Sequence, residues 1–282
     1  MKFEKSVIEL IKMRKSSRTF DNIEIESKTL QKLKDYIAEI NQETQIKARF
    51  IFVSNRGIDS GDSGTAKKMG TYGVISGADS FIIGIIDKSE NGALEFGYSF
   101  EKIVLFATDL GLQTCWLGGT FNRSDFAQNM SLHEDEYIAI VSPVGIKRGK
   151  ARVFESAMRN VFGAKKRKPW NELFFEGYSS LPLKESRVTD YAIPLEMVRI
   201  GPSAANKQPW RIIKDNNIFH FYITRTKGFK MMGYDMQKND LGIAKCHFEL
   251  SANELGLKGE WQEMKDINTS NGWEYVCSWV SI

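Results

Sequence analysis

The feature that most constrains the fold is an internal match between two distant segments. Residues 96–116 (FGYSFEKIVLFATDLGLQTCW) align without a gap with residues 241–261 (LGIAKCHFELSANELGLKGEW), so that Gly97 pairs with Gly242 and Trp116 with Trp261. Amphipathic helices often resemble one another by chance. Here, however, strand-like sequences match in the same order on both sides, SFIIGI with IFHFYI and EYIAIVS with EYVCSWV. Two copies of one α+β unit predict a fused pseudo-dimer of two diverged halves.

The apolar patterns predict helices and strands in each half. We place the first half at residues 1–180 and the second, shorter half at 181–282. A helical stripe at Val7, Ile8, Leu10 and Ile11 precedes a helix capped by Ser27, and Pro194 is placed where a helix of the second half begins. Further helices are expected over 96–112 and 241–257, and strands over 49–54, 80–86, 136–146, 210–214, 218–224 and 274–282.

Composition narrows the class of protein. The chain has 282 residues with 42% hydrophobic and 26% charged side chains, which is typical of a globular protein and allows a large core. Three widely spaced cysteines predict neither a disulfide framework nor a metal site, and a cytoplasmic location is the simple expectation. Three scattered histidines disfavour zinc hydrolases and histidine-based triads. No apolar run is long enough for a membrane span.

Three segments carry candidate chemistry. RKSSRTF (14–20) follows the first helical stripe and offers arginine forks and hydroxyls suited to phosphate oxygens, although a solvated basic helix end is the alternative. GPSAANKQPW (201–210) holds small and amide residues between two prolines. This pattern is typical of a rigid loop that contacts the edge of a flat ring, and a plain connecting loop is the alternative. GLQTCWLGGTF (111–121) has paired glycines that leave backbone donors uncovered, or that simply end a helix.

Taken together, RxSxRxF, PSxxNxQPW and GLxxCWxGG resemble the sequence hallmarks of the nitroreductase family, and the two-half arrangement resembles its thermophile-type single-chain branch. The resemblance implies an α+β nitroreductase-like fold that binds FMN between the halves. It places the phosphate at Arg14, Lys15 and Ser16, and Arg18 at the ribityl and pyrimidine region. The remaining implied flavin contacts are Trp116, Leu117, Gly118, Gly119, Lys165, Arg167, Pro202, Ser203, Ala204 and Asn206.

Each half lacks one of these motifs. The first half has INQETQIKARF where a PSxxNxQPW loop would follow its helix, and the second half has LKESRVTDY in place of RxSxR. The family's dimers have two flavin sites, so this chain is expected to keep one FMN and to act as a monomer. The sequence also lacks a clear counterpart of the family's asparagine or lysine facing the flavin pyrimidine, and Thr71 to Gly73 fall near that position.

The resemblance implies an FMN-dependent oxidoreductase. Hydride passes from NADH or NADPH through FMN to a nitroaromatic, quinone or similar small acceptor, by a ping-pong mechanism, and Arg18 is the candidate that stabilises the anionic reduced flavin. Two alternatives stay open: a flavin-binding protein of regulatory or storage type with little turnover, and a relative that reduces enones or fragments flavin. The basic run KKRK (165–168) lacks the interleaved aromatic residues of a nucleic-acid patch, so no nucleic-acid partner is expected.

Overall fold

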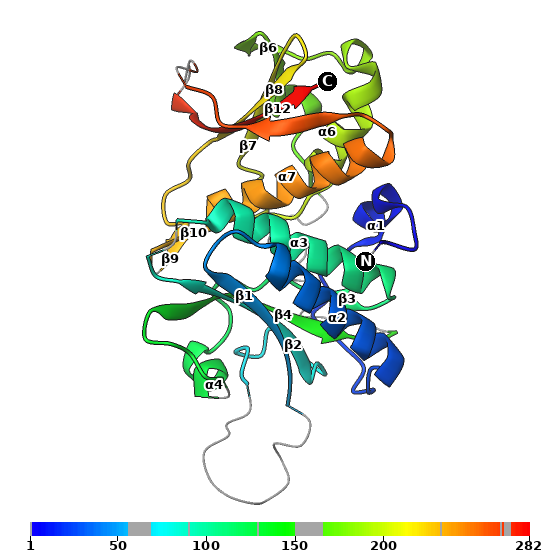
Figure 1. Ribbon diagram of the computed structural model, residues 1–282, viewed down its shortest axis with the longest axis vertical. Coiled ribbons are helices and arrows are strands. Elements are labelled where there is room, and N and C mark those ends of the chain that lie inside the picture. Colours follow the sequence, from blue (N-terminus) through cyan, green and yellow to red (C-terminus); the bar gives the residue numbers. More distant parts are fainter. Residues whose placement is uncertain are drawn as a thin grey trace, which may run out of the picture.

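The structure is a computed structural model that describes residues 2–55, 69–89, 91–128, 130–149, 166–231, 233–265, 267 and 272–282. Two β-sheets lie at opposite ends of the molecule, and the long helices α3 (Ala93–Asp109) and α7 (Met236–Glu254) lie between them (Figure 1). Within the described residues, no helix is long and apolar enough to span a bilayer.

The first sheet has the strand order β1-β2-β4-β3, and all its pairs are antiparallel. The central strand β2 is buried on both faces. Ile82 and Ile86 pack with α2 and α3, whereas Phe81, Ile83 and Ile85 pack on the opposite face. The elements of this half are α1 (Val7–Met13), α2 (Ser27–Glu43), β1 (Ala48–Ser54), β2 (Ser80–Asp87), β3 (Gln113–Thr114), α4 (Arg123–Gln128) and β4 (Glu136–Gly145).

The second sheet has the order β11-β12-β8-β7-β5-β6. Its strands are β5 (Phe174–Glu176), β6 (Tyr178–Pro182), β7 (Trp210–Asp215), β8 (Ile218–Ile223), β11 (Gly259–Gln262) and β12 (Glu274–Ser281). Read from β7, the order β7-β8-β12-β11 repeats β1-β2-β4-β3, with every pair antiparallel in both sets. Strands β5 and β6 come before β7 in sequence and form one edge of the second sheet. There β5 pairs in parallel with β7.

Shorter elements connect these layers. The 3₁₀ turns are η1 (Trp170–Glu172), η2 (Glu185–Arg187), η3 (Thr189–Tyr191) and η4 (Ala204–Asn206), and a small ribbon joins β9 (Lys230–Met231) to β10 (Tyr234–Asp235). Helix α6 (Ala192–Ile200) packs on α7. Helix α1 is tied to the end of α7, because Glu254 accepts hydrogen bonds from the Ser6 hydroxyl and the Val7 amide.

The helices α3 and α7 cross at two glycines. A Cβ atom on Gly97 would overlap the backbone carbonyl of Asn239, and a Cβ on Gly242 would overlap that of Leu94 and lie 3.0 Å from the Gly97 Cα. The two clashes are reciprocal, since 242 exceeds 97 by the same 145 residues by which 239 exceeds 94. Glycine at both positions therefore allows close backbone contact along the whole crossing.

The structure confirms most of the expected elements and corrects four helix starts. Helix α3 begins at Ala93, three residues before the expected 96, and ends at Asp109. Ser27 is the first residue of α2, and Glu26 is its N-cap without a side-chain capping bond. Helix α6 begins at Ala192, so Pro194 lies inside its first turn, where a missing amide hydrogen costs little. Helix α7 begins at Met236, five residues before the expected 241, because the Asp235 side chain caps it by accepting from the amides of Gln237 and Lys238.

Candidate functional site

The RKSSRTF segment is held extended along the first sheet. Helix α1 ends at Met13, and the Arg14 amide donates to the Leu10 carbonyl at 2.8 Å. The Ser17 amide then donates to the Thr114 carbonyl at 2.9 Å, and Ser16 and Thr114 form a parallel bridge. On its other side, the Arg18 carbonyl accepts from the Ser76 amide at 2.9 Å. These backbone bonds fix where the side chains of residues 14–18 leave the chain.

Arg14 carries a buried guanidinium with incomplete hydrogen bonding. Its side chain is 7% exposed, and its Nε and Nη1 atoms have no hydrogen-bond partner among the described residues. Its nearest described anion is Glu101, with 3.9 Å between Arg14 Nε and Glu101 Oε1. The Nε of Arg18 is also buried without a partner in the described residues. Because unpaired buried donors are costly, both arginines are suited to an anionic ligand. The neighbouring Lys15 is exposed.

The GPSAANKQPW loop has a strained and well-anchored backbone. Ala205, Asn206 and Gln208 have φ values of 47°, 54° and 49°, in the left-handed region that non-glycine residues rarely adopt. The Ser203 hydroxyl accepts from the Gln208 amide at 2.9 Å, and the buried Gln208 side chain accepts from the Lys168 amide at 2.7 Å. Strain of this kind is retained where the surroundings impose it, commonly at ligand sites.

Asp240 on α7 holds the start of this loop. Both of its carboxyl oxygens accept from the Ala204 amide, at 2.9 and 3.1 Å. Burial raises the pKa of Asp240 well above its ordinary value, and the negative charge of Asp235 adds to this effect, while the bond from Ala204 opposes it. A raised pKa means that burial away from water favours the neutral form of this carboxyl group.

Arg167 binds the loop at 201–210 and lies within electrostatic range of Arg14. It donates to the side-chain oxygen of Asn206 and, through Nη2, to the Ile200 carbonyl at 2.9 Å. Its pKa is lowered to about 10, first by burial and then by the positive charges of Arg14 and Arg199. The structure therefore brings Arg14, Arg167 and Asn206 together, although they are far apart in the sequence. Lys165, the other expected basic residue here, lies outside the described residues.

The GLQTCWLGGTF segment follows α3 and returns along the first sheet. Leu117 pairs with Val141, with 2.9 Å between its amide and the Val141 carbonyl. The Trp116 indole donates to Glu101 Oε2 at 2.9 Å. A Cβ on Gly118 would overlap the end of the Met236 side chain at the start of α7, whereas Gly119 is exposed. This segment is thus the part of the first half that faces the start of α7.

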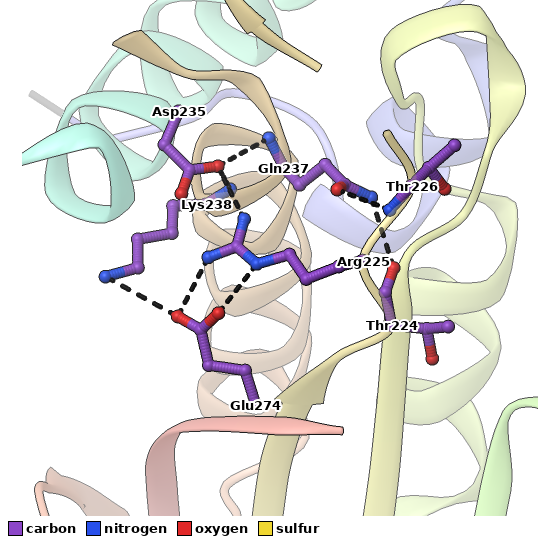
Figure 2. Close-up of polar contacts among 7 residues, drawn as sticks. All are labelled: Thr224, Arg225, Thr226, Asp235, Gln237, Lys238 and Glu274. Atoms are coloured by element: carbon purple, nitrogen blue, oxygen red, sulfur yellow. Dashed lines mark hydrogen bonds and ion pairs between the residues drawn. The ribbon is translucent and has the colours of Figure 1, made fainter. Parts of the chain in front are cut away.

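A balanced ion network fixes that helix start (Figure 2). Arg225 lies between two carboxylates and donates to Asp235 at 2.8 Å and to both oxygens of Glu274, at 2.6 and 2.8 Å. Lys238 lies 3.7 Å from Glu274. Burial alone would raise the pKa of Asp235, but hydrogen bonds from Arg225 and the Lys238 amide lower it overall. Two cations here face two anions, so the network holds α7 in place and leaves no charge for a ligand.

Two described cavities are lined by none of the flavin-contact residues expected from the sequence. One of about 460 Å³ is lined by Asn22, Asn55, Thr71, Gly73 and Asp79, among others. The other, of about 300 Å³, lies beside the ion network and is lined by Arg225 to Phe229 and Gln237. Thr71 is engaged in a turn, since its carbonyl accepts from the Val74 amide at 2.9 Å. Which residue faces a flavin pyrimidine in this region therefore stays a prediction that rests on Thr71 to Gly73.

Sequence reasoning missed two buried groups beside Arg14. Glu101 and His247 are both fully buried, and His247 Nε2 lies 2.9 Å from Glu101 Oε1. His247 Nδ1 lies 2.9 Å from the Met197 carbonyl in the last turn of α6. The sequence showed no partner for His247, because its contacts come from α3 and α6, which are remote in the chain. Neither residue stands out in the sequence, because α3 and α7 each carry several other charged side chains.

The sequence and the fold were both compared with known proteins. A family model described as "Putative TM nitroreductase" matches residues 6–252. The structure of a "putative nitroreductase" from Thermotoga maritima is 19% identical, with a TM-score of 0.59, and the match covers 99% of this chain and 95% of that one. A search of curated proteins gives no match.

Shorter proteins match part of the chain. A nitroreductase family protein from Clostridium difficile is 20% identical with a TM-score of 0.42, over 61% of this chain and 96% of that one. A nitroreductase with bound FMN from Desulfitobacterium hafniense is 19% identical with a TM-score of 0.41, over 52% of this chain and 91% of that one. The Thermotoga protein shares the fold over nearly the whole length, and the family model spans most of the sequence. The chain therefore belongs to the Putative TM nitroreductase family.

Proposed function

We propose that the chain binds one FMN between its two halves and is an FMN-dependent NAD(P)H oxidoreductase. The observation that carries this proposal is the buried Arg14 guanidinium, which has two unpaired nitrogen atoms and lies beside Arg167 and its partner Asn206. The unpaired donors of Arg14 and the second positive charge of Arg167 together suit a dianionic group such as a phosphate, since Glu101 is too far from Arg14 for a hydrogen bond.

The described residues fit FMN. Arg14, Ser16 and Arg167 would hold its phosphate, and Arg18, whose Nε is buried and unpaired among the described residues, would approach the ribityl and pyrimidine region. The rigid loop Pro202, Ser203, Ala204 and Asn206 would bound the ring from the second half, and Trp116 to Gly119 from the first. Lys15 is exposed, and its place at the phosphate rests on the family resemblance.

When bound, FMN supplies the capacity to accept a hydride from NADH or NADPH and to pass electrons to a nitro group, quinone or similar acceptor. The chain's own residues bind and orient that group. The positive charge of Arg18 would favour the anionic form of a reduced ring. No side-chain nucleophile is required for this chemistry, which is compatible with a site built from arginines, a tryptophan and backbone donors.

The proposal includes a fused pseudo-dimer that acts as a monomer, with halves at 1–180 and 181–282, except that β5 and the first part of β6 complete the sheet of the second half. Three observations support it: the repeated order of the four antiparallel strands, the reciprocal contacts of Gly97 and Gly242, and matched helix ends. At those ends Gly111 and Gly256 have φ values of 79° and 75°, and the next amides donate to Ala107 and Ala252 at 2.9 Å. Closed two-fold assemblies place equivalent positions in mutual contact in this way.

The second half would not form a site of its own. In the segment LKESRVTDY, which stands where an RxSxR motif would be expected, Arg187 is exposed and donates to Glu176 at 2.9 Å. It is therefore already paired at the surface, in contrast to the buried and unsatisfied Arg14. This difference supports a stoichiometry of one FMN per chain.

Anaerobic titration of the flavin-loaded protein with NADPH and NADH tests the activity. The proposal predicts bleaching of the oxidised flavin absorbance and its recovery when a quinone or nitroaromatic compound is added. A protein that binds FMN tightly but stays oxidised with both donors would instead be a storage or regulatory protein. Enone reduction by the reduced protein, without nitro or quinone reduction, would change the acceptor and leave the flavin site in place.

A further inference from the structure

A buried hydrogen-bonded cluster joins the two halves behind Arg14. Glu101 on α3 is its centre, and it contacts one group from the second half and two from the first. Oε1 lies 2.9 Å from His247 Nε2 and 3.9 Å from Arg14 Nε, and Oε2 accepts from the Trp116 indole at 2.9 Å. The side chains of Glu101 and His247 are both 0% exposed. Water therefore has no access through which to screen the charges in this cluster.

The hydrogen bonds determine how many protons the Glu101–His247 pair holds. A backbone carbonyl can only accept, so the Met197 carbonyl requires a proton on His247 Nδ1. Glu101 Oε2 accepts from Trp116, which leaves Oε1 to face His247 Nε2. A hydrogen bond at that position needs one more proton, on either the imidazole or the carboxyl. The pair is electrically neutral in both cases, because imidazolium with carboxylate and imidazole with carboxylic acid have the same total charge.

The number of protons on the Glu101–His247 pair determines whether the positive charge of Arg14 is neutralised. A carboxylate without its own proton donor would form a direct ion pair with the guanidinium and cancel its charge. In the structure the separation from Glu101 is too long for a hydrogen bond, and Arg14 Nε and Nη1 have no such partner among the described residues. Glu101 is the one carboxylate among the described residues that forms an ion pair with Arg14, and Arg167 adds a second positive charge near it. The Cys246 thiol has its pKa raised by burial and then by Glu101, which favours its neutral form.

We propose that His247 is a positioning residue for the phosphate site: by sharing a proton with Glu101, it keeps the positive charge of Arg14 available to a phosphate monoester. His247 connects the two halves, because it contacts Glu101 of the first half and also binds the Met197 carbonyl near the start of the loop at 201–210. The proposal rests on the proposed flavin function, and it assigns to the second half a role in phosphate affinity that does not require contact with the phosphate.

The test compares FMN with riboflavin, which lacks the phosphate, on flavin-free full-length protein. Fluorescence titration or calorimetry gives the two dissociation constants, and their ratio is the readout. His247→Gln retains a donor toward Glu101 but supplies no extra proton, so Glu101 becomes a charged partner for Arg14. We expect FMN affinity to fall about tenfold, the scale of one charged hydrogen bond, and riboflavin affinity to stay within about twofold.

A second substitution tests the proton count directly. In the double variant Glu101→Gln/His247→Gln the negative charge is removed, Arg14 is released, and the FMN-to-riboflavin ratio should return toward the wild-type value. A purely structural role for His247 would instead weaken both ligands together and would leave the double variant at least as weak. If His247→Gln does not fold, Glu101→Gln alone decides, because it keeps the pair neutral and should leave the ratio of the two dissociation constants unchanged. A clear gain in FMN affinity with unchanged riboflavin affinity would show that Glu101 neutralises Arg14 in the wild type and would overturn the proposal.

The outcomes separate this inference from the flavin function. An unchanged FMN preference in His247→Gln, with wild-type protein that favours FMN over riboflavin, overturns the role of His247 alone. Wild-type protein that binds neither ligand, or binds both equally, overturns the proposed phosphate site itself.

Discussion

Arg167 donates a hydrogen bond to the side-chain oxygen of Asn206, and the same guanidinium lies close enough to Arg14 for that positive charge to contribute to its lowered pKa. One side chain thus contacts the loop at 201–210 of the second half and lies within electrostatic range of Arg14 in the first half. A second bond to the Ile200 carbonyl fixes its direction. The candidate site exists because these two distant segments meet there.

Arg167→Met should loosen the loop as well as remove charge. We expect riboflavin affinity to fall about fivefold, the scale of one lost hydrogen bond, and FMN affinity to fall further. Lys166→Met is the matched control, since this neighbour carries the same charge on an exposed side chain. Equal behaviour of the two variants would contradict a specific role for Arg167.

Arg14→Gln should act on the phosphate alone. Its buried guanidinium is replaced by a neutral amide, so FMN affinity should drop about 10- to 100-fold with little change for riboflavin. Arg187→Gln is the control from the other half, because Arg187 is exposed and already paired with Glu176. Titration of both flavins checks this, and a comparable FMN loss in the control variant would refute the assignment of a single site.

Gly97→Ala should destabilise the whole molecule. The new methyl group would overlap the Asn239 carbonyl, which belongs to the backbone of α7 and cannot rotate away. Overpacking of this kind costs about 1–3 kcal/mol, measurable as a lower midpoint of urea unfolding. Gly149→Ala is the control, since a Cβ there meets no atom within 4 Å. Unfolding midpoints that match in both variants would argue against a tight α3–α7 crossing.

Asp240→Asn should stabilise the protein at neutral pH. Burial raises the pKa of Asp240 in the folded state, so the folded chain binds more protons than the unfolded chain above the ordinary aspartate value of 3.8. Stability from this group is therefore present at low pH and is lost as pH rises through that range. Asparagine can still accept from the Ala204 amide. The Tm advantage of the variant should grow from pH 4 to pH 7, and a constant or negative difference would contradict the shift.

The strands of the fold follow from local sequence, whereas helix limits do not. Strand β2 follows from a local pattern, because SFIIGII is apolar throughout and its side chains fill two separate cores. The start of α7 was missed because Gln237, Asn239 and Asp240 are polar residues that the structure buries. Their partners are the Thr226 amide, the Tyr234 hydroxyl and the Ala204 amide. A hydropathy pattern cannot reveal polar groups whose partners are tertiary.

The site divides in the same way. The motifs around Arg14 and Asn206 were predicted as local sequence patterns, and the structure brings both to Arg167. The pairing of Glu101 with His247 was not predicted, because it depends on how α3 and α7 cross. A fixed crossing makes neighbours of residues that are 146 positions apart. Sequence periodicity gives the buried face of each helix but not the register between two helices.

A single flavin phosphate site, built jointly by the two halves, would give one FMN per chain. Native mass spectrometry of the protein saturated with FMN, together with flavin absorbance per chain, measures the stoichiometry and the oligomeric state at once. We expect a monomer carrying one FMN. Two FMN molecules per chain, or no bound FMN, would contradict it.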